Sequence, residues 1–260
     1  KASIERAVEG CDVVITTANA VAPRKKTDTL KAIDILGYQD LITLAKKAGV
    51  QQFIYTSGFP FSEKNRKWVP LSDSKEKTEA FLKASGMNYT ILQSDAFMDI
   101  YFTFMGTSLL VQNEPAALVN RPWAFMQNFY NGVKNDIENG KINIIGEGTT
   151  QHCFITIDNV ADFLVKAIGH PDMLNTTHII GGPEALSGLE VKSIFEKVLG
   201  KKLTIKKTPA LMMKIMGNVF SLFNQPASNM FKLNYVNATE SSIIDTNELA
   251  DALGIQLTSA

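Results

Sequence analysis

Short runs of β-branched and aromatic residues alternate with longer segments of helical spacing along the first third of the chain. Three such runs occupy residues 12–17, 52–57 and 88–93, and two helical segments separate them at residues 27–48 and 74–84. Runs this short and continuously apolar are typical of strands buried on both faces, and helical crossovers between them produce parallel pairing. The order therefore predicts an α/β fold built on a doubly wound parallel sheet.

The rest of the chain continues in the same manner, with a looser pattern between residues 109 and 139. Short apolar or alternating runs predict strands at residues 141–145, 153–157, 178–180 and 202–207. Helical spacing predicts helices at residues 2–9, 123–138, 160–169, 188–199, 210–223 and 246–253. We find no internal repeat and no clear linker, so both halves are expected to form one compact unit.

Composition excludes several classes of protein. The 260 residues include 26 lysines and arginines and 26 aspartates and glutamates, and the net charge is zero. That balance argues against a general electrostatic affinity for nucleic acid or for anionic membranes. Two cysteines, Cys11 and Cys153, make no disulfide framework, which favours a reducing, cytoplasmic location. The longest apolar runs, residues 100–111 and 211–223, are interrupted or amphipathic and predict no membrane span.

Five segments, taken in order, carry a family resemblance. They are VEGCDVVITTA, GYQDLITLAKKAGVQQFIYTSG, SDSKEKTEAFLKASGMNYTILQSDAFMD, HCFITIDNVADFLVKAI and IIGGPEALSGLEVKSIFEKVLGK. Their order and spacing resemble the NmrA-like family of atypical short-chain dehydrogenases over nearly the whole chain. The resemblance implies one NAD(P)-binding domain over residues 1–260, with a Rossmann-type sheet and a small C-terminal α/β substrate lobe. The Rossmann part is expected at about 1–108 and 141–170, and the lobe at about 109–140 and 171–260.

The same resemblance implies a first βαβ unit whose glycine-rich turn holds the cofactor phosphates at a helix N-terminus. Nothing in this sequence matches that turn, and the first visible strand corresponds to the family's fourth. Because the chain also begins at Lys1 rather than at methionine, we expect its N-terminus to be truncated, with the first strands and any targeting segment missing. The pair Gly181 and Gly182 has the wrong spacing for a phosphate site and is interpreted as a turn. We expect this chain to bind dinucleotides weakly or not at all.

Ligands of doubly wound sheets bind at the carboxyl ends of the strands. The resemblance implies that the cofactor is NADP or NAD, with NADP favoured, and that it contacts the residues following each strand. These cofactor-binding candidates are Thr16, Thr17, Ala18, Asn19, Ser57, Gly58, Lys75, Gln93, Ser94 and Phe97.

Ser57 and Lys75 are the catalytic candidates, because they resemble two members of the Ser-Tyr-Lys set of short-chain dehydrogenases. In that set the serine hydrogen-bonds the substrate carbonyl, the tyrosine donates a proton and the lysine holds the nicotinamide ribose. The tyrosine position, four residues before the lysine, holds Leu71, which cannot donate a proton. Relatives of the isoflavone-reductase kind rely on the lysine, and a partly desolvated lysine can act as an acid near neutral pH. The alternatives are a turn-capping serine and a solvated lysine.

Other polar residues favour structural interpretations. Tyr55 shares a strand face with Ser57 and is interpreted as a core residue. Asp158 is interpreted as the N-cap of the helix that follows it. His152 and Cys153 are adjacent, but no further ligand stands at metal spacing, and we expect no metal site.

The segment 210–223 is rich in methionine and phenylalanine. Its apolar stripe is formed by Leu211, Ile215, Val219 and Leu222. We interpret this stripe as a core-packing face, with a methionine-lined lid or a partner-binding face as the alternative.

Two functions remain open. The first is an NAD(P)H-dependent oxidoreductase that reduces a small, rather apolar carbonyl, quinone or enone compound. The second is a non-catalytic NAD(P)-binding regulatory or assembly protein of the NmrA type, which Leu71 favours. A small-molecule substrate is the expected partner of the first, and a protein partner or a second copy of the chain that of the second.

Overall fold

The computed structural model describes residues 1–260 with the exception of residues 22, 24, 26, 104 and 107–123. The chain divides by its internal contacts into two compact units, each assembled from segments far apart in sequence. Unit 1 comprises Lys1–Asp95, Asp158–Ile180 and Thr246–Leu257, and unit 2 comprises Ala96–Ile157, Gly181–Asp245 and Thr258–Ala260. Of the looser segment expected at residues 109–139, residues 109–123 lie outside the described residues, and the helix predicted at residues 123–138 is present as α6 (Ala124–Glu138).

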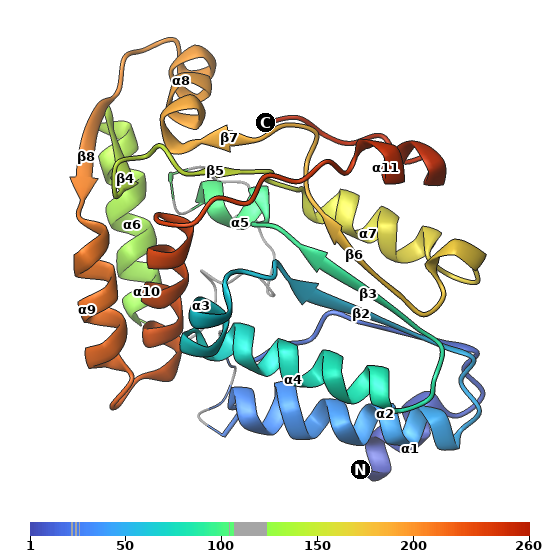
Figure 1. Cartoon of the computed structure of the whole chain (residues 1–260). Coiled ribbons are helices and arrows are strands. Elements are labelled where there is room, and N and C mark those ends of the chain that lie inside the picture. Colours follow the sequence, from blue (N-terminus) through green and yellow to red (C-terminus); the bar gives the residue numbers. More distant parts are fainter. Residues whose placement is uncertain (22, 24, 26, 104, 107–123) are drawn as a thin grey trace. The chain divides into compact units, whose positions relative to one another are not determined.

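Unit 1 is built on the parallel sheet that the alternating pattern predicts (Figure 1). Its strands are, in sheet order, β1 (Val13–Thr16), β2 (Gln52–Gly58), β3 (Tyr89–Ser94) and β6 (Thr176–Ile180). All neighbouring strands run parallel. β6 falls within the range predicted for the substrate lobe, yet it pairs with β3 through Thr90–Ser94 and belongs to this sheet.

The side chains of β2 alternate between two packed faces, so both sides of the sheet are covered. Phe53 and Tyr55 enter a core with α2 and α4, where Ile42 and Leu82 are fully buried. Gln52 faces the other side, where its amide donates to the carbonyl of Ala167, just after α7, at 2.9 Å. The sheet is therefore doubly wound, and Tyr55 is a core residue as predicted.

Figure 1 shows the helices of unit 1, among which α2 and α4 lie side by side along the sheet. The helices of this unit are α1 (Ala2–Val8), the π-helical turn η1 (Lys31–Gly37), α2 (Tyr38–Lys47), α3 (Glu63–Trp68), α4 (Pro70–Ala84), α7 (Ile157–Lys166), the 3₁₀ turn η3 (Pro171–Met173) and α11 (Asn247–Leu253). Asp158 lies inside the first turn of α7, so its predicted role as the N-cap is wrong. There the carboxylate still meets the positive end of the helix dipole.

The helical segment at residues 31–47 begins as a π-helix and continues as an α-helix. Its most buried stripe differs from the apolar spacing of the sequence and is formed by Leu30, Asp34, Tyr38, Ile42 and Ala45. A π-helix has more residues per turn than an α-helix, so the stretch η1 turns the preceding residues relative to α2. Asp34, a carboxylate, lies in this buried stripe four residues from both Leu30 and Tyr38, so it faces the core although its charge favours the surface.

Unit 2 has its own core, formed around the β4 strand and helices α5, α6 and α8. Its elements are α5 (Met98–Thr103), α6 (Ala124–Glu138), β4 (Lys141–Ile145), β5 (Gln151–His152), β7 (Leu186–Ser187), α8 (Gly188–Leu199), β8 (Thr204–Thr208), α9 (Ala210–Phe220) and α10 (Gln225–Asn237). β4 pairs in parallel with β8, and β5 pairs antiparallel with β7. β4 thus lies in unit 2 although its range was predicted for the Rossmann part. The strand predicted at residues 153–157 is wrong, because only Ile155 makes a bridge there, to Phe97.

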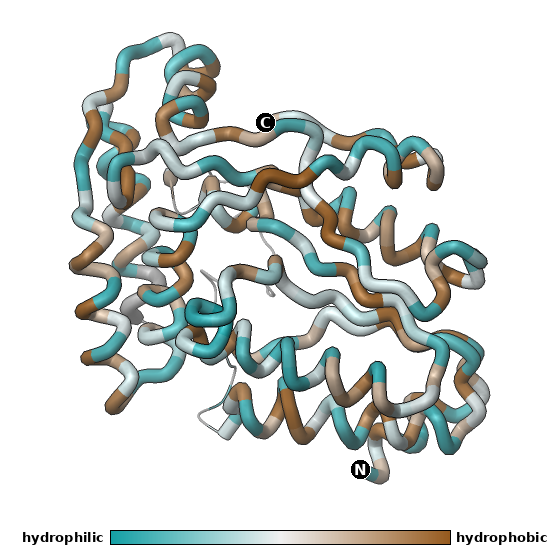
Figure 2. Tube along the Cα trace, in the orientation of Figure 1, coloured by the Kyte–Doolittle hydropathy of each residue, from teal (hydrophilic) through white to brown (hydrophobic). Residues whose placement is uncertain are grey.

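The predicted packing role of the α9 stripe is also wrong. Leu211, Ile215 and Leu222 are 64%, 54% and 84% exposed, so this stripe is not a core face. α9 instead packs its other side on α10, where a Cβ placed on Gly217 would lie 2.7 Å from Cγ of Lys232. Only glycine permits this close approach. Figure 2 shows that hydrophobic residues recur along α9, and several of them are exposed.

α10 itself was not predicted. Its start is marked in the sequence by Asn224, whose side chain accepts a hydrogen bond from the Ala227 amide, and by Pro226 in the first turn. Among the described residues, we find no helix that combines the length and apolarity needed to cross a membrane. Cys11 and Cys153 are both free thiols.

Candidate functional site

The carboxyl ends of β2 and β3 meet at one edge of the sheet, as predicted for a ligand site. Ser57 is in register with Gln93, and Gly58 with Ser94. The Ser94 hydroxyl donates to the carbonyl of Ser57 at 3.2 Å, which ties the two strand ends together. This edge therefore gathers four of the predicted site residues on neighbouring strands.

A pocket opens at this edge between β2, α3 and α4. Its lining, which we call the Ser57 pocket, consists of Ser57, Gly58, Phe59, Pro60, Arg66, Ser72, Lys75, Glu76, Glu79 and Gln93. Ser57 is 2% exposed, and its hydroxyl has no hydrogen-bond partner among the described residues. A buried hydroxyl without a partner costs free energy, about 1–3 kcal/mol, and such groups in native proteins commonly serve a ligand.

Lys75 stands beside Ser57 on α4, and its ammonium is held by neutral groups. Nζ donates to the carbonyl of Thr56 at 2.8 Å and lies 5.2 Å from the centroid of the Tyr55 ring. Burial lowers the pKa of Lys75 to about 8, against the opposing effect of the Asp34 and Glu79 carboxylates. Lys75 is therefore half-buried and hydrogen-bonded, unlike the solvated lysine considered as the alternative, and its side chain can exchange a proton near neutral pH.

Asp34 is the carboxylate in the buried stripe of η1 and α2, and it is fully buried. Its Oδ2 accepts a hydrogen bond from the Ala20 amide at 2.8 Å, while Oδ1 has no partner among the described residues. Burial raises the pKa of Asp34 to about 6, opposed by the Ala20 hydrogen bond and by Lys75. Asp34 and Lys75 therefore form an acid and a base whose pKa values both lie close to neutrality.

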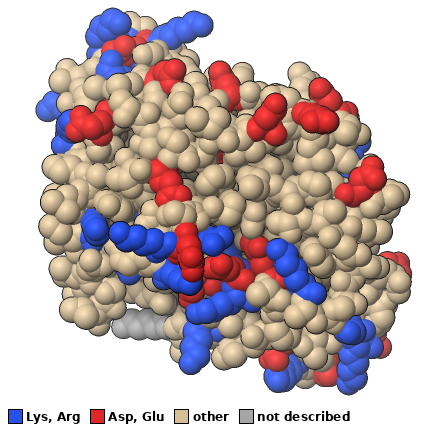
Figure 3. Space-filling model, viewed as in Figure 1, with Lys and Arg blue, Asp and Glu red and all other residues tan. Residues whose placement is uncertain are grey.

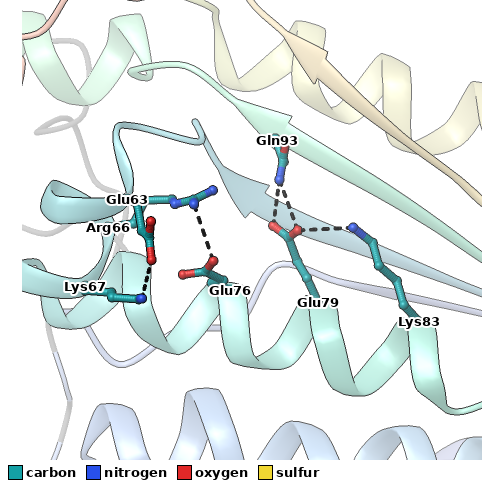
Figure 4. A network of polar contacts seen from close by, with 7 residues as sticks. All are labelled: Glu63, Arg66, Lys67, Glu76, Glu79, Lys83 and Gln93. Atoms are coloured by element: carbon teal, nitrogen blue, oxygen red, sulfur yellow. Dashed lines mark hydrogen bonds and ion pairs between the residues drawn. The ribbon is translucent and has the colours of Figure 1, made fainter.

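Glu79 is held by polar partners from β3 and from its own helix (Figure 4). Both of its carboxylate oxygens accept from the Gln93 amide at 3.0 Å, and Nζ of Lys83 lies 3.7 Å away. The predicted cofactor contact Gln93 is consequently fixed in orientation by a carboxylate. Figure 3 shows that charges of both signs are mixed over α3 and α4 around this network.

The end of β1 has a different character. The Thr16 hydroxyl lies 2.9 Å from the Tyr38 hydroxyl, which donates to the carbonyl of Ala18 at 2.6 Å. Thr17, Ala18 and Asn19 follow the strand and are exposed. Tyr38 thus pins the backbone that leaves β1, while the predicted contact residues after Thr16 remain accessible.

Two further positions singled out in the sequence, Phe97 and Leu71, do not line the Ser57 pocket. Phe97 belongs to unit 2, where it forms an isolated bridge with Ile155. Leu71 lies in the first turn of α4, and its carbonyl accepts a hydrogen bond from the Ser74 hydroxyl. Asp34, Arg66 and Glu79 were not predicted as site residues. Asp34 carries a signal in the sequence, since it stands four residues from both Leu30 and Tyr38 on a helical face.

The NmrA-like family profile matches residues 1–250 of this chain. The chain belongs to the NmrA-like family. A curated relative, the Photosystem II assembly factor Ycf39 of Synechocystis sp., is 26% identical over 224 residues, which cover 85% of this chain and 58% of that protein. This NmrA-like chain thus spans somewhat more than half the length of that relative.

Solved structures share the fold. A triphenylmethane reductase from Citrobacter sp., in complex with NADP(H), superposes with a TM-score of 0.67 at 17% identity and covers 99% of this chain and 77% of that one. A nucleoside-diphosphate-sugar epimerase from Staphylococcus aureus superposes with a TM-score of 0.70 at 15% identity and covers the same shares, 99% and 77%. An assembly factor, a reductase and an epimerase therefore resemble this NmrA-like chain, and its function has to be argued from the site itself.

Proposed function

We propose that the protein is an NAD(P)H-dependent reductase of a small, rather apolar carbonyl, quinone or enone compound. The observation that carries the proposal is the buried Ser57 hydroxyl, which has no hydrogen-bond partner among the described residues and lines a pocket together with Lys75. A substrate oxygen that accepts a hydrogen bond from Ser57 would satisfy this hydroxyl. Phe59 and Pro60 supply an apolar wall of the same pocket.

The strand-end residues fit the nicotinamide half of a dinucleotide, because they offer an unpartnered hydroxyl and a lysine at the carboxyl edge of a parallel sheet. Ser57, Gly58, Lys75, Gln93 and Ser94 would hold that half, with Thr16–Asn19 as further contacts. We favour NADP over NAD, because the superposed triphenylmethane reductase binds NADP(H). When bound, the reduced nicotinamide supplies a hydride.

The residues of this chain would supply the remaining steps. The Ser57 hydroxyl donates a hydrogen bond to the carbonyl oxygen and stabilises the negative charge that develops there as the hydride adds to carbon. Lys75, with a pKa of about 8, gives a proton to that oxygen to complete the alcohol and is reprotonated from water. Leu71 cannot take this role, so the proton passes through the lysine. The buried Asp34 carboxylate opposes the loss of the Lys75 charge and keeps its pKa from falling further.

The test is NADPH oxidation by the full-length protein with a panel of carbonyls, quinones and enones, at a concentration at which NADPH is shown to be bound. We expect Lys75→Met to lower kcat by about 10²–10⁴-fold, the usual contribution of general acid catalysis. Lys77→Met is the matched control, because Lys77 is exposed on the same helix and pairs only with Asp73 among the contacts described. If NADPH binds but is not oxidised above background with any compound of the panel, the reductase proposal is wrong.

A second function is favoured by the exposed α9 stripe and by Leu71. In this case the protein would be a non-catalytic NAD(P)-binding assembly or regulatory factor that contacts a protein partner, like the relative named as an assembly factor. The two free cysteines suit either function in a reducing, cytoplasmic setting. Complementation of a deletion strain separates the two. Failure of Lys75→Met to complement supports the reductase. Failure of Ile215→Asp to complement, together with complementation by Lys75→Met, supports the assembly factor.

A further inference from the structure

Two buried hydrogen-bond donors without partners line the Ser57 pocket. One is the Ser57 hydroxyl, and the other is Nε of Arg66, which comes from α3. Both atoms are shielded from solvent and neither has a hydrogen-bond partner among the described residues. Unsatisfied buried donors are rare in native proteins, so two on one pocket point to a ligand that carries acceptors.

The neighbouring charges explain why Arg66 keeps an unused donor. Its Nη2 lies 3.5 Å from a carboxylate oxygen of Glu76, and Figure 4 shows these two side chains facing each other. Glu79, the other carboxylate of the pocket, is occupied by Gln93 and Lys83. Both carboxylates thus already have partners, while the Nε–H group of the guanidinium is left for a ligand. An arginine held in this way presents one fixed donor rather than a mobile charge.

We infer that Arg66 is a specificity-determining residue of the Ser57 pocket, which selects carbonyl compounds carrying a second oxygen acceptor, a carboxylate or a second carbonyl. The reducible carbonyl oxygen binds the Ser57 hydroxyl, and the second oxygen accepts from Nε of Arg66. A compound with a single carbonyl leaves the Arg66 donor buried and unpaired, and is discriminated against for that reason. The inference rests on the proposed reductase function for its choice of reacting group, and on the two orphaned donors for the binding site.

The experiment measures binding without cofactor, so that it does not depend on catalysis. Three probes of similar size are titrated into the ¹⁵N-labelled full chain: pyruvate, methyl pyruvate and butanone. Amide shifts of Gly58 and Ser72, which line the pocket, report occupancy. We expect pyruvate or methyl pyruvate to bind at least about tenfold more tightly than butanone. Tight binding of both pyruvate and methyl pyruvate would show that a second carbonyl oxygen is a sufficient acceptor for Arg66. Tight binding of pyruvate alone would show that Arg66 requires a carboxylate.

Arg66→Gln and Arg66→Lys should each weaken binding of the preferred probe about tenfold, since neither retains the planar Nε donor. Lys64→Gln is the matched control, because it removes the same charge from an exposed position of the same helix. Equal binding of butanone and pyruvate, or unchanged binding in folded Arg66→Lys, would overturn the inference. Selective binding that depends on Arg66, without NADPH oxidation of any probe, would leave the site standing and contradict only the reductase.

Discussion

Two helical segments of this chain place residues against their usual preference. In unit 1, the stripe of η1 and α2 buries a carboxylate, Asp34, between Leu30 and Tyr38. In unit 2, α9 leaves Leu211, Ile215 and Val219 exposed and turns Met213 and Gly217 inward. The first segment thus buries an ionisable side chain, and the second exposes apolar side chains to solvent.

The difference shows what an amphipathic pattern can and cannot determine. Spacing identifies a helix and its apolar side, but the side that packs is decided by how closely the neighbouring element can approach. At Gly217 the approach of Lys232 requires the absence of a side chain, and this contact outweighs the apolar stripe. Burying the Asp34 carboxylate is unfavourable, yet the carboxylate interacts electrostatically with Lys75, whose pKa is also shifted. Neighbouring groups with shifted pKa values are characteristic of functional sites.

The largest expected effect tests whether the two stripes differ in their contribution to stability. Ile42→Ala empties a fully buried position of α2 and should lower the free energy of unfolding by about 2–5 kcal/mol. Ile215→Ala removes the same atoms from a 54% exposed position of α9 and should change it by less than about 0.5 kcal/mol. Urea unfolding followed by circular dichroism measures both. Equal losses would mean that the α9 stripe is covered in solution.

The next effect concerns the buried carboxylate. Burial raises the pKa of Asp34 from 3.8 to about 6, so the folded state binds this proton more tightly than the unfolded chain. The resulting stability is present in full below about pH 4 and is lost as the pH rises through about 6. Asp34→Asn should remove this slope and, at pH 7, stabilise the fold by up to about 3 kcal/mol. Unfolding measured at several pH values between 4 and 8 checks the sign, and a parallel slope in the variant would contradict it.

The same substitution should have a cost in activity if the reductase proposal holds. Without the carboxylate, which opposes the fall of the Lys75 pKa, the alkaline limb of the kcat profile should move to lower pH. A more stable and less active variant would mark Asp34 as a functional residue rather than a packing defect.

The smallest effect tests the packed side of α9. Gly217→Ala places a Cβ 2.7 Å from Cγ of Lys232 and should destabilise the protein by about 1–2 kcal/mol. Gly132→Ala on α6 meets nothing within 4 Å and should stabilise it by about 0.5–1 kcal/mol, through helix propensity. Thermal melts of the two variants should shift in opposite directions. A neutral Gly217→Ala would indicate that α9 is free to move away from α10.

Much of unit 1 could be predicted from the sequence, because its strands are short continuous runs of β-branched and aromatic residues. The strands at Val13, Gln52 and Tyr89 and the helix between Pro70 and Ala84 follow from local pattern alone. The pairing of β6 with β3 and of β4 with β8 could not be predicted in this way, because partners far apart in the chain leave no local signal.

The residues of the candidate site likewise include some that the sequence predicted and others that it did not. Ser57, Gly58, Lys75 and Gln93 line one pocket, and the family resemblance had indicated all four. Asp34 was missed although its spacing from Leu30 and Tyr38 is helical, because a carboxylate is ordinarily expected on the exposed face of a helix. Arg66 was missed because its neighbourhood, with Lys64 and Lys67 exposed, gives the appearance of an ordinary solvated helix.

The π-helical turn η1 also bears on how such a site can arise and be lost. A π-helical segment is commonly the trace of a residue inserted into an α-helix, which is absorbed by widening the turn. Removing one residue from Ile35–Leu36, where Leu36 is half exposed, would shorten the spacing between Asp34 and Tyr38 from four residues to three and turn Asp34 relative to α2. A single codon deletion would then change the surroundings of a carboxylate that acts on the Lys75 charge, without replacing any residue that lines the Ser57 pocket.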